Sequence, residues 1–169
     1  MPLSSGDNMV KKADIEIIRR MHAVEKASLQ FIRLVESHSK LGPLQQGKLP
    51  GQGTQTITLG INIDSITNKV QAVVTLKLVM AYEEGGDHDP PVQVSATFQL
   101  QYAVEKVPRQ RQLLEEALQQ VAMMNIWPYW REFVQSSSVR MGLPPLPVPL
   151  FHVAQLEKLI PEQGEKKTK

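Results

Sequence analysis

Cysteine is absent from the 169-residue sequence, which excludes disulfides, thiolate metal sites and a cysteine nucleophile. An excess of one charge is also lacking, because 19 Lys and Arg stand against 17 Asp and Glu. We therefore expect no nucleic-acid partner, which would require a clustered basic excess. No apolar run approaches the roughly 18 residues of a membrane span, and the first residues lack the basic-then-apolar order of a signal peptide. These absences predict a cytoplasmic protein without membrane insertion.

Motifs for catalysis or metal binding are lacking as well. Residues 42–48 match the G-x-x-x-x-G-K pattern of a phosphate-binding loop, but Leu49 replaces the Ser or Thr that binds magnesium, and Pro50 prevents a helix from starting. The four histidines show no i, i+4 pairing with another ligand, and the acidic loop 83–91 is typical of a solvated hairpin tip. We expect a protein that is not an enzyme and that holds neither a metal nor a cofactor.

Alternating apolar and polar residues predict three strands, at 56–64, 69–82 and 92–105. The connections between them are the short segment 65–68 and the Gly- and Pro-containing loop 83–91. Because short connections between alternating runs produce antiparallel neighbours, we expect a meander with one apolar face.

The segment upstream of these strands is ambiguous. Apolar residues at helical spacing favour one helix from 14 to about 37, with Asp14 as its N-cap. Alternation over Leu29, Phe31, Arg33 and Val35 fits a strand equally well.

The C-terminal third changes period to that of a helix. Because Pro128 interrupts the pattern, it predicts two helices, at 110–124 and 128–140, and Gly142 is well placed to end the second. Residues 143–150 read LPPLPVPL and must be extended, since proline fixes φ and biases its predecessor away from helix.

The two ends of the chain are polar. We expect a flexible N-terminus over 1–12, a single domain over 13–160 that closes with a short helix at about 152–160, and a disordered tail over 161–169.

Two motifs follow one another within residues 125–151. The first, P-Y-x-R-E, is matched by Pro128, Tyr129, Arg131 and Glu132. The second, G-F-P-P-x-x-L-x-P-x-N-F, has twelve positions and is matched by a stretch that is two residues shorter. The matching residues are Gly142, Pro144, Pro145, Pro149 and Phe151, with Leu143 and Leu150 in place of its Phe and Asn. This combination resembles the SecB family of export chaperones, and the resemblance covers roughly residues 54–160.

The resemblance implies an α+β fold in which a four-stranded antiparallel β-meander packs against long helices on one face. Applied to the ambiguous segment, it implies an extra N-terminal helix over 14–27 and a first strand over 29–38. It also implies a homotetramer, a dimer of dimers, that acts as a holdase: it binds unfolded preproteins and keeps them competent for export.

Departures from the family pattern leave alternatives open. Family members are acidic and dock the SecA motor through acidic strand residues, whereas this chain is near neutral and has Thr97 at such a position. This puts SecA docking in doubt. An alternative is a SecB-like chaperone dedicated to a toxin–antitoxin module, with an antitoxin as client. A further alternative is a protein-interaction module of SecB fold without chaperone activity.

Two sets of residues are the candidate sites. Four of the nine aromatic residues cluster at helical spacing, and we expect them at the oligomer interface: Trp127, Tyr129, Trp130 and Phe133. The proline-fixed apolar segment and the adjoining methionine are expected to bind clients: Leu143, Leu146, Val148, Leu150, Phe151 and Met141. Among these, we expect Leu146, Val148 and Leu150 to contribute more to client binding than to folding.

Overall fold

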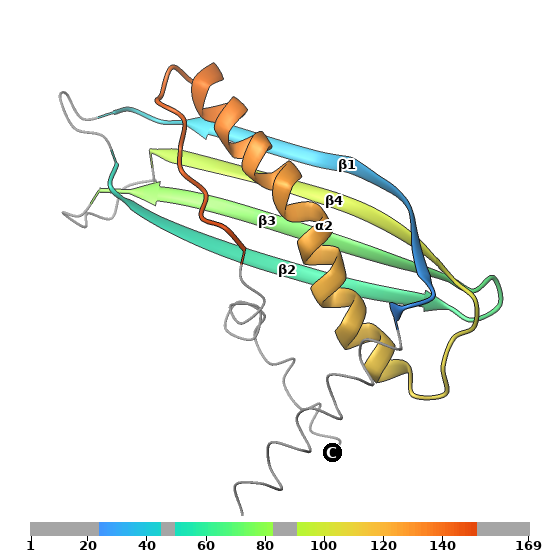
Figure 1. Cartoon of the computed structure of the whole chain (residues 1–169). Coiled ribbons are helices and arrows are strands. Elements are labelled where there is room, and N and C mark those ends of the chain that lie inside the picture. The colour runs from blue at the N-terminus through green and yellow to red at the C-terminus, as the bar shows by residue number, and fades with distance from the viewer. Residues whose placement is uncertain (1–23, 45–49, 83–90, 152–169) are drawn as a thin grey trace, which may run out of the picture.

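The computed structural model describes residues 24–44, 50–82 and 91–151 and has the predicted α+β architecture (Figure 1). Four long antiparallel strands form one sheet, and a long helix lies diagonally across one face. The strands are β1 (Ala27–Leu41), β2 (Gln52–Asp64), β3 (Lys69–Ala81) and β4 (Val92–Val104), and the helix is α2 (Arg111–Arg140). The strand order is β1-β4-β3-β2, so β1 and β2 are the two edges.

The order of the strands refines the prediction. β2, β3 and β4 follow one another as the expected meander, whereas β1 pairs with β4 and not with β2. The strand predicted over 29–38 is confirmed and is longer at both ends. The predicted helix 14–27 lies outside the described residues up to residue 23, and its predicted last residue, Ala27, belongs to β1. The predicted helix 152–160, the flexible N-terminus and the disordered tail lie outside the described residues.

Strict alternation in β3 and β4 builds the core. On the face toward α2, apolar residues sit opposite one another, as in the pairs Val70–Tyr102 and Val74–Phe98, and all four are buried. The opposite face carries mainly polar residues from the intervening positions, so the sheet has one predominantly apolar face as predicted.

Tyr102 links the sheet to α2. Its hydroxyl accepts a hydrogen bond of 3.0 Å from the Asn125 side chain, and burial raises the pKa of the Tyr102 phenol. A buried hydroxyl needs such a partner, because leaving it unpaired would cost roughly 1–3 kcal/mol.

The prediction of two helices divided at Pro128 is wrong, because α2 is a single helix of 30 residues that contains Pro128. An internal proline removes one backbone hydrogen bond and costs about 3 kcal/mol in a helix. Burial of Trp127 and Trp130 on either side offsets this cost, since a large apolar side chain gains about 1.5–3 kcal/mol on burial. Pro128 itself is exposed, so water can reach the Met124 carbonyl that lies one turn before it on the same face.

The end of α2 agrees with the prediction. The helix finishes at Arg140, and Gly142 has φ of 76°, the left-handed conformation that glycine adopts at low cost after a helix. The Gly142 N–H donates to the Val139 carbonyl at 3.0 Å. The chain then reverses and runs back beside α2.

Candidate polypeptide-binding surface

The returning segment, residues 142–151, is extended and is called the strap below. In Figure 1 it crosses the sheet from the β1 side toward β2. Its start is fixed by Ser138, which is fully buried. The Ser138 carbonyl accepts from the Leu143 N–H at 2.9 Å, and the Ser138 hydroxyl accepts from the Leu146 N–H at 3.2 Å. The strap is therefore anchored to the last turns of α2.

Two side chains of α2 hold the far half of the strap. Trp127 Nε1 donates to the Pro149 carbonyl at 2.9 Å, and Arg131 Nε donates to the Val148 carbonyl at 3.1 Å. The rings of Trp127 and Phe151 also contact one another, with centroids 5.1 Å apart. The prolines of the strap lack an N–H, so the strap cannot form the regular backbone hydrogen bonds of a β-strand. Side-chain donors from α2 bond its carbonyl groups instead. The sequence motifs contain Arg131, but they did not predict that Arg131 and Trp127 hold the strap.

The six residues predicted to bind clients divide by exposure. Leu143 and Val148 are buried in the core of the chain, with 7% and 3% of their surface exposed. Met141, Leu146 and Phe151 are half-buried and pack against that core. Leu150 is 63% exposed. Val148 therefore occupies a core position, although we expected it to contribute more to client binding than to folding. Leu150 is the member of the set most open to a client.

The four aromatic residues predicted at an oligomer interface also divide. Trp127 and Trp130 are buried by this chain itself, and Phe133 is half-buried with its ring 6.3 Å from that of Trp130. Trp130 Nε1 is buried without a hydrogen-bond acceptor. Tyr129 is 53% exposed and shares the outward side of α2 with Met124 and Val139. Tyr129 is thus the one of the four whose position leaves most of its surface for a partner.

The β2 edge is a feature that the sequence patterns did not reveal. Its register with β3 is uninterrupted over all 13 residues, and it has no charged side chain before Asp64. Thr56, Thr58 and Gly60 lie on its polar face, and space around Gly60 is open. Among the described residues, no backbone hydrogen bond is made along its outer side. The alternation of apolar and polar residues predicted this strand, but only the strand order shows that it lies at an edge of the sheet.

The β1 edge differs in each of these respects. Its pairing with β4 is irregular after Leu29 and after Leu34, and it carries Arg33 and Glu36. α2 packs mainly on β2, β3 and β4, so several apolar side chains of β1 remain 39–58% exposed. These are Leu29, Leu34, Val35 and Leu41.

The two central strands carry no acidic residue on the polar face of the sheet. Its four cationic residues are Arg33, Lys40, Lys69 and Lys77. The acidic residues that the register places on this face are Glu36 and Asp64, both on edge strands. At the centre, Thr75 and Thr97 face one another with hydroxyls 3.0 Å apart. This face is unsuited to binding a basic segment through the central strands.

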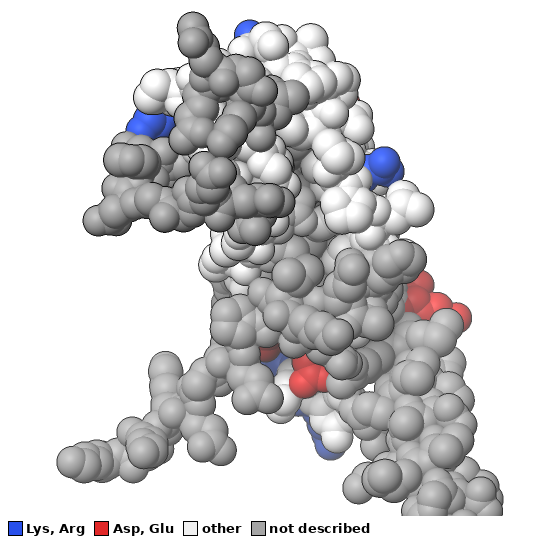
Figure 2. Space-filling model, turned by 90° about the vertical axis from the view of Figure 1, so that its left-hand side faces the viewer, with Lys and Arg blue, Asp and Glu red and all other residues white. Residues whose placement is uncertain are grey.

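Charge is also sparse on the described surface at one end of the sheet. Figure 2 looks at the end of the sheet where β1 and β3 finish, and most of the described surface in this view is uncharged, with isolated blue and red groups. The described residues contain no cluster of His, Cys, Asp and Glu able to hold a metal ion. Within the same residues, no helix has the length and apolar character needed to cross a membrane.

Comparison with known proteins finds no matching family model and no matching curated protein. Among solved structures, the chain is similar to a SecB-like chaperone of Mycobacterium tuberculosis, solved in complex with a ChAD peptide from an antitoxin. The TM-score is 0.65 at 14% identity, over 81% of this chain and 99% of the other. This chain has the fold of a SecB-like chaperone. The prediction made from the motifs in residues 125–151 is thereby confirmed for the fold.

A second solved structure is a protein of unknown function from Streptococcus agalactiae, with a TM-score of 0.43 and 12% identity over 73% of this chain and 97% of the other.

Proposed function

We propose that this protein is a holdase chaperone that binds extended segments of unfolded polypeptides along the β2 edge, next to the end of the strap. The observation that carries the proposal is the regular, uncharged β2 edge, whose outer side makes no backbone hydrogen bond among the described residues. The SecB-like fold, and the peptide bound to the mycobacterial neighbour, support a chaperone role.

The chemistry of an edge strand suits a chaperone. An added strand is held by backbone hydrogen bonds, which every client can make whatever its sequence. Alternate client side chains then face the apolar side of the sheet, where Leu150 and the half-buried Phe151 add apolar surface. The prolines of the strap keep it from pairing with β2 itself.

The exposed side chains of β1 support the predicted homotetramer. Leu34 and Val35 leave about half of their surface in solvent on the strand against which α2 packs least. A second copy of the chain would bury them, and apolar burial is the main force in such association. We propose that β1 and the outward side of α2, with Tyr129, join the subunits of a cytoplasmic tetramer.

The charge on the sheet favours an antitoxin-type client over the general export role. Export through SecA would need acidic strand residues to receive a basic segment, and the central strands β3 and β4 present none on the polar face. We therefore propose service to a toxin–antitoxin module as the first role and protein export as the second candidate.

Aggregation assays test the proposal. The chain should suppress aggregation of several unrelated, chemically unfolded proteins at near-stoichiometric ratio. Gly60→Lys places a charge on the β2 edge, where the open space accepts a side chain. Val73→Lys is the matched control, because Val73 is the register partner of Gly60 on the same face of β3, and it is 41% exposed.

We expect Gly60→Lys to weaken client binding about tenfold and Val73→Lys to change it less than about twofold, a difference of roughly 1 kcal/mol. Failure of the unmodified chain to suppress any aggregation would favour the interaction module without chaperone activity. Equal loss in both variants would refute the β2 edge as the site.

A further inference from the structure

A basic cavity lies at the opposite end of α2 from the start of the strap. It has a volume of about 400 Å³ and lies between the β2–β3 turn and the connection from β4 to α2. Its lining residues are Ser65, Asn68, Lys106, Val107, Pro108, Arg109 and Arg111. Three of the seven are cationic and none is acidic, so the cavity has a net positive charge although the whole chain is nearly neutral.

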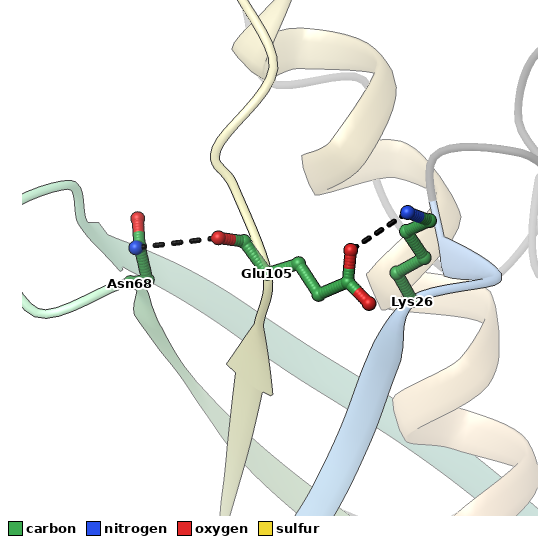
Figure 3. Close-up of polar contacts among 3 residues, drawn as sticks. All are labelled: Lys26, Asn68 and Glu105. Atoms are coloured by element: carbon green, nitrogen blue, oxygen red, sulfur yellow. Dashed lines mark hydrogen bonds and ion pairs between the residues drawn. The ribbon is translucent and has the colours of Figure 1, made fainter.

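The two carboxylates that adjoin lining residues in the sequence are engaged elsewhere. The Glu105 carboxylate accepts from Lys26 Nζ at 2.7 Å, and Figure 3 shows it pointing away from Asn68, which lines the cavity. The Asp64 carboxylate accepts from the backbone N–H groups of Ile66 and Thr67 and from the Thr67 hydroxyl. Neither carboxylate lines the cavity to neutralise its cations.

Hydrogen bonds fix the turn that forms one wall. Asn68 adopts φ of 52°, its carbonyl accepts from the Val104 N–H at 2.9 Å, and its side chain donates to the Glu105 carbonyl at 3.4 Å (Figure 3). Arg111 donates to the Ser65 hydroxyl at 2.5 Å and so joins the turn to α2. The wall is therefore held in one arrangement before any ligand binds.

The same turn presents an apolar side chain to solvent. Ile66 is 94% exposed, the largest exposed fraction among the large apolar residues of the described chain. An isoleucine held on a rigid turn beside a cationic cavity combines an apolar anchor with a charged recognition site, which is a pattern of protein–protein contact surfaces.

We propose that this surface, formed by Ile66 and the basic cavity, binds an acidic polypeptide segment that carries an apolar residue beside its carboxylates. Charge complementarity selects an acidic ligand, and the apolar Ile66 selects a polypeptide over a free anion. The surface is separate from the strap, since Arg111 and Trp127 are about 24 Å apart along α2 at 1.5 Å per residue. Its occupancy does not depend on the proposed holdase activity.

Direct binding of short peptides to the full chain tests this site. The probes are three fluorescein-labelled peptides of about ten residues: alternating Glu and Gly, the same peptide with one central Leu, and alternating Gln and Gly. Anisotropy is recorded at low salt, where exposed charges are screened least. We expect both Glu peptides to bind and the Gln peptide not to bind. The Leu-containing peptide should bind roughly threefold more tightly, and Ile66→Ala should remove that advantage.

Charge variants locate the binding. The double variant Lys106→Gln/Arg109→Gln should weaken binding of the Glu peptides roughly 3- to 30-fold, because each exposed ion pair contributes modestly. The control Lys77→Gln/Arg140→Gln removes the same charge from exposed positions away from the cavity and should stay within about twofold. Circular dichroism confirms folding of each variant.

Three results would overturn the proposal. The first is that both double variants weaken binding equally, and the second is that the Gln peptide binds as tightly as the Glu peptides. The third is that inorganic phosphate or a single-stranded oligonucleotide displaces the Glu peptides at lower concentration than unlabelled Glu peptide does.

Discussion

The two edges of the sheet are built differently. β1 pairs irregularly with β4, carries charged residues and leaves apolar side chains exposed on the face toward α2. β2 pairs with β3 without interruption and has no charged side chain until its last residue. An edge that is irregular and charged resists addition of a foreign strand, whereas a regular uncharged edge invites it.

The difference separates two kinds of recognition. A copy of the same chain always offers the same side chains, so a contact through Leu34 and Val35 can be specific. Unfolded clients share only their backbone, so a contact that must serve many sequences is best made through backbone hydrogen bonds. We therefore assign self-association to β1 and client binding to β2.

The largest effect expected is on the core that supports both edges. Trp130 is fully buried, and Trp130→Ala should lower the free energy of unfolding by about 3–5 kcal/mol. Urea denaturation measures this, and both self-association and client binding should fall together. Loss of one function with the other intact would show that the edges do not depend on a common core.

Charges on β1 come next. Leu34→Lys with Val35→Lys should weaken self-association at least about a hundredfold, or roughly 2.7 kcal/mol, because two apolar contacts are replaced by like charges. Light scattering should show a smaller mass at micromolar concentration. Gly60→Lys on β2 is the control and should leave the mass unchanged. If the unmodified chain is a monomer, or if both variants lose mass, the assignment of self-association to β1 is wrong.

Within the strap, truncating a buried residue and truncating an exposed residue should have different effects on stability and client binding. Val148→Ala should destabilise the fold by about 2 kcal/mol, because two buried methyl groups are lost. Leu150→Ala should change stability by less than about 0.5 kcal/mol, as is usual at exposed positions, and should instead weaken client binding severalfold. Urea denaturation and a client titration of both variants distinguish the roles. Identical behaviour would place both residues in the same environment.

The smallest effect expected lies at the end of β2. The Thr67 hydroxyl, and then the N–H groups of Ile66 and Thr67, lower the pKa of the Asp64 carboxyl. Because the folded-state pKa lies below the unfolded value of about 3.9, this stabilisation is complete above that pH and is lost as pH falls through the folded pKa. Asp64→Asn should therefore be slightly less stable than the unmodified chain at pH 7 and should differ less at about pH 3. An unchanged difference would exclude the charge as the cause.

Local patterns predicted the elements of the fold better than their arrangement. Alternation gave β2, β3 and β4, and the resemblance chose a strand for 29–38, because each pattern reflects burial of one face. The place of β1 beside β4 is a choice of tertiary structure that no local pattern contains. The continuity of α2 through Pro128 was missed for a related reason: the proline penalty is local, whereas the burial that offsets it comes from the sheet and strap.

The candidate site shows the same limit. The sequence indicated that 143–150 is extended, but the bonds from Trp127 and Arg131 that hold it join residues 22 and 17 positions apart. It did not separate buried Val148 from exposed Leu150, because both belong to one proline-fixed apolar run. The β2 edge became visible only once the strand order was known.

Amide hydrogen exchange of β2, with and without a bound unfolded client, tests the central claim most directly. In an antiparallel edge strand every second amide points away from the sheet and lacks a partner there. The account predicts that client binding slows exchange at alternate amides between residues 54 and 63, while the intervening amides, already bonded to β3, change little. Protection confined to the strap, α2 or the polar face of the sheet, with β2 unchanged, would contradict it.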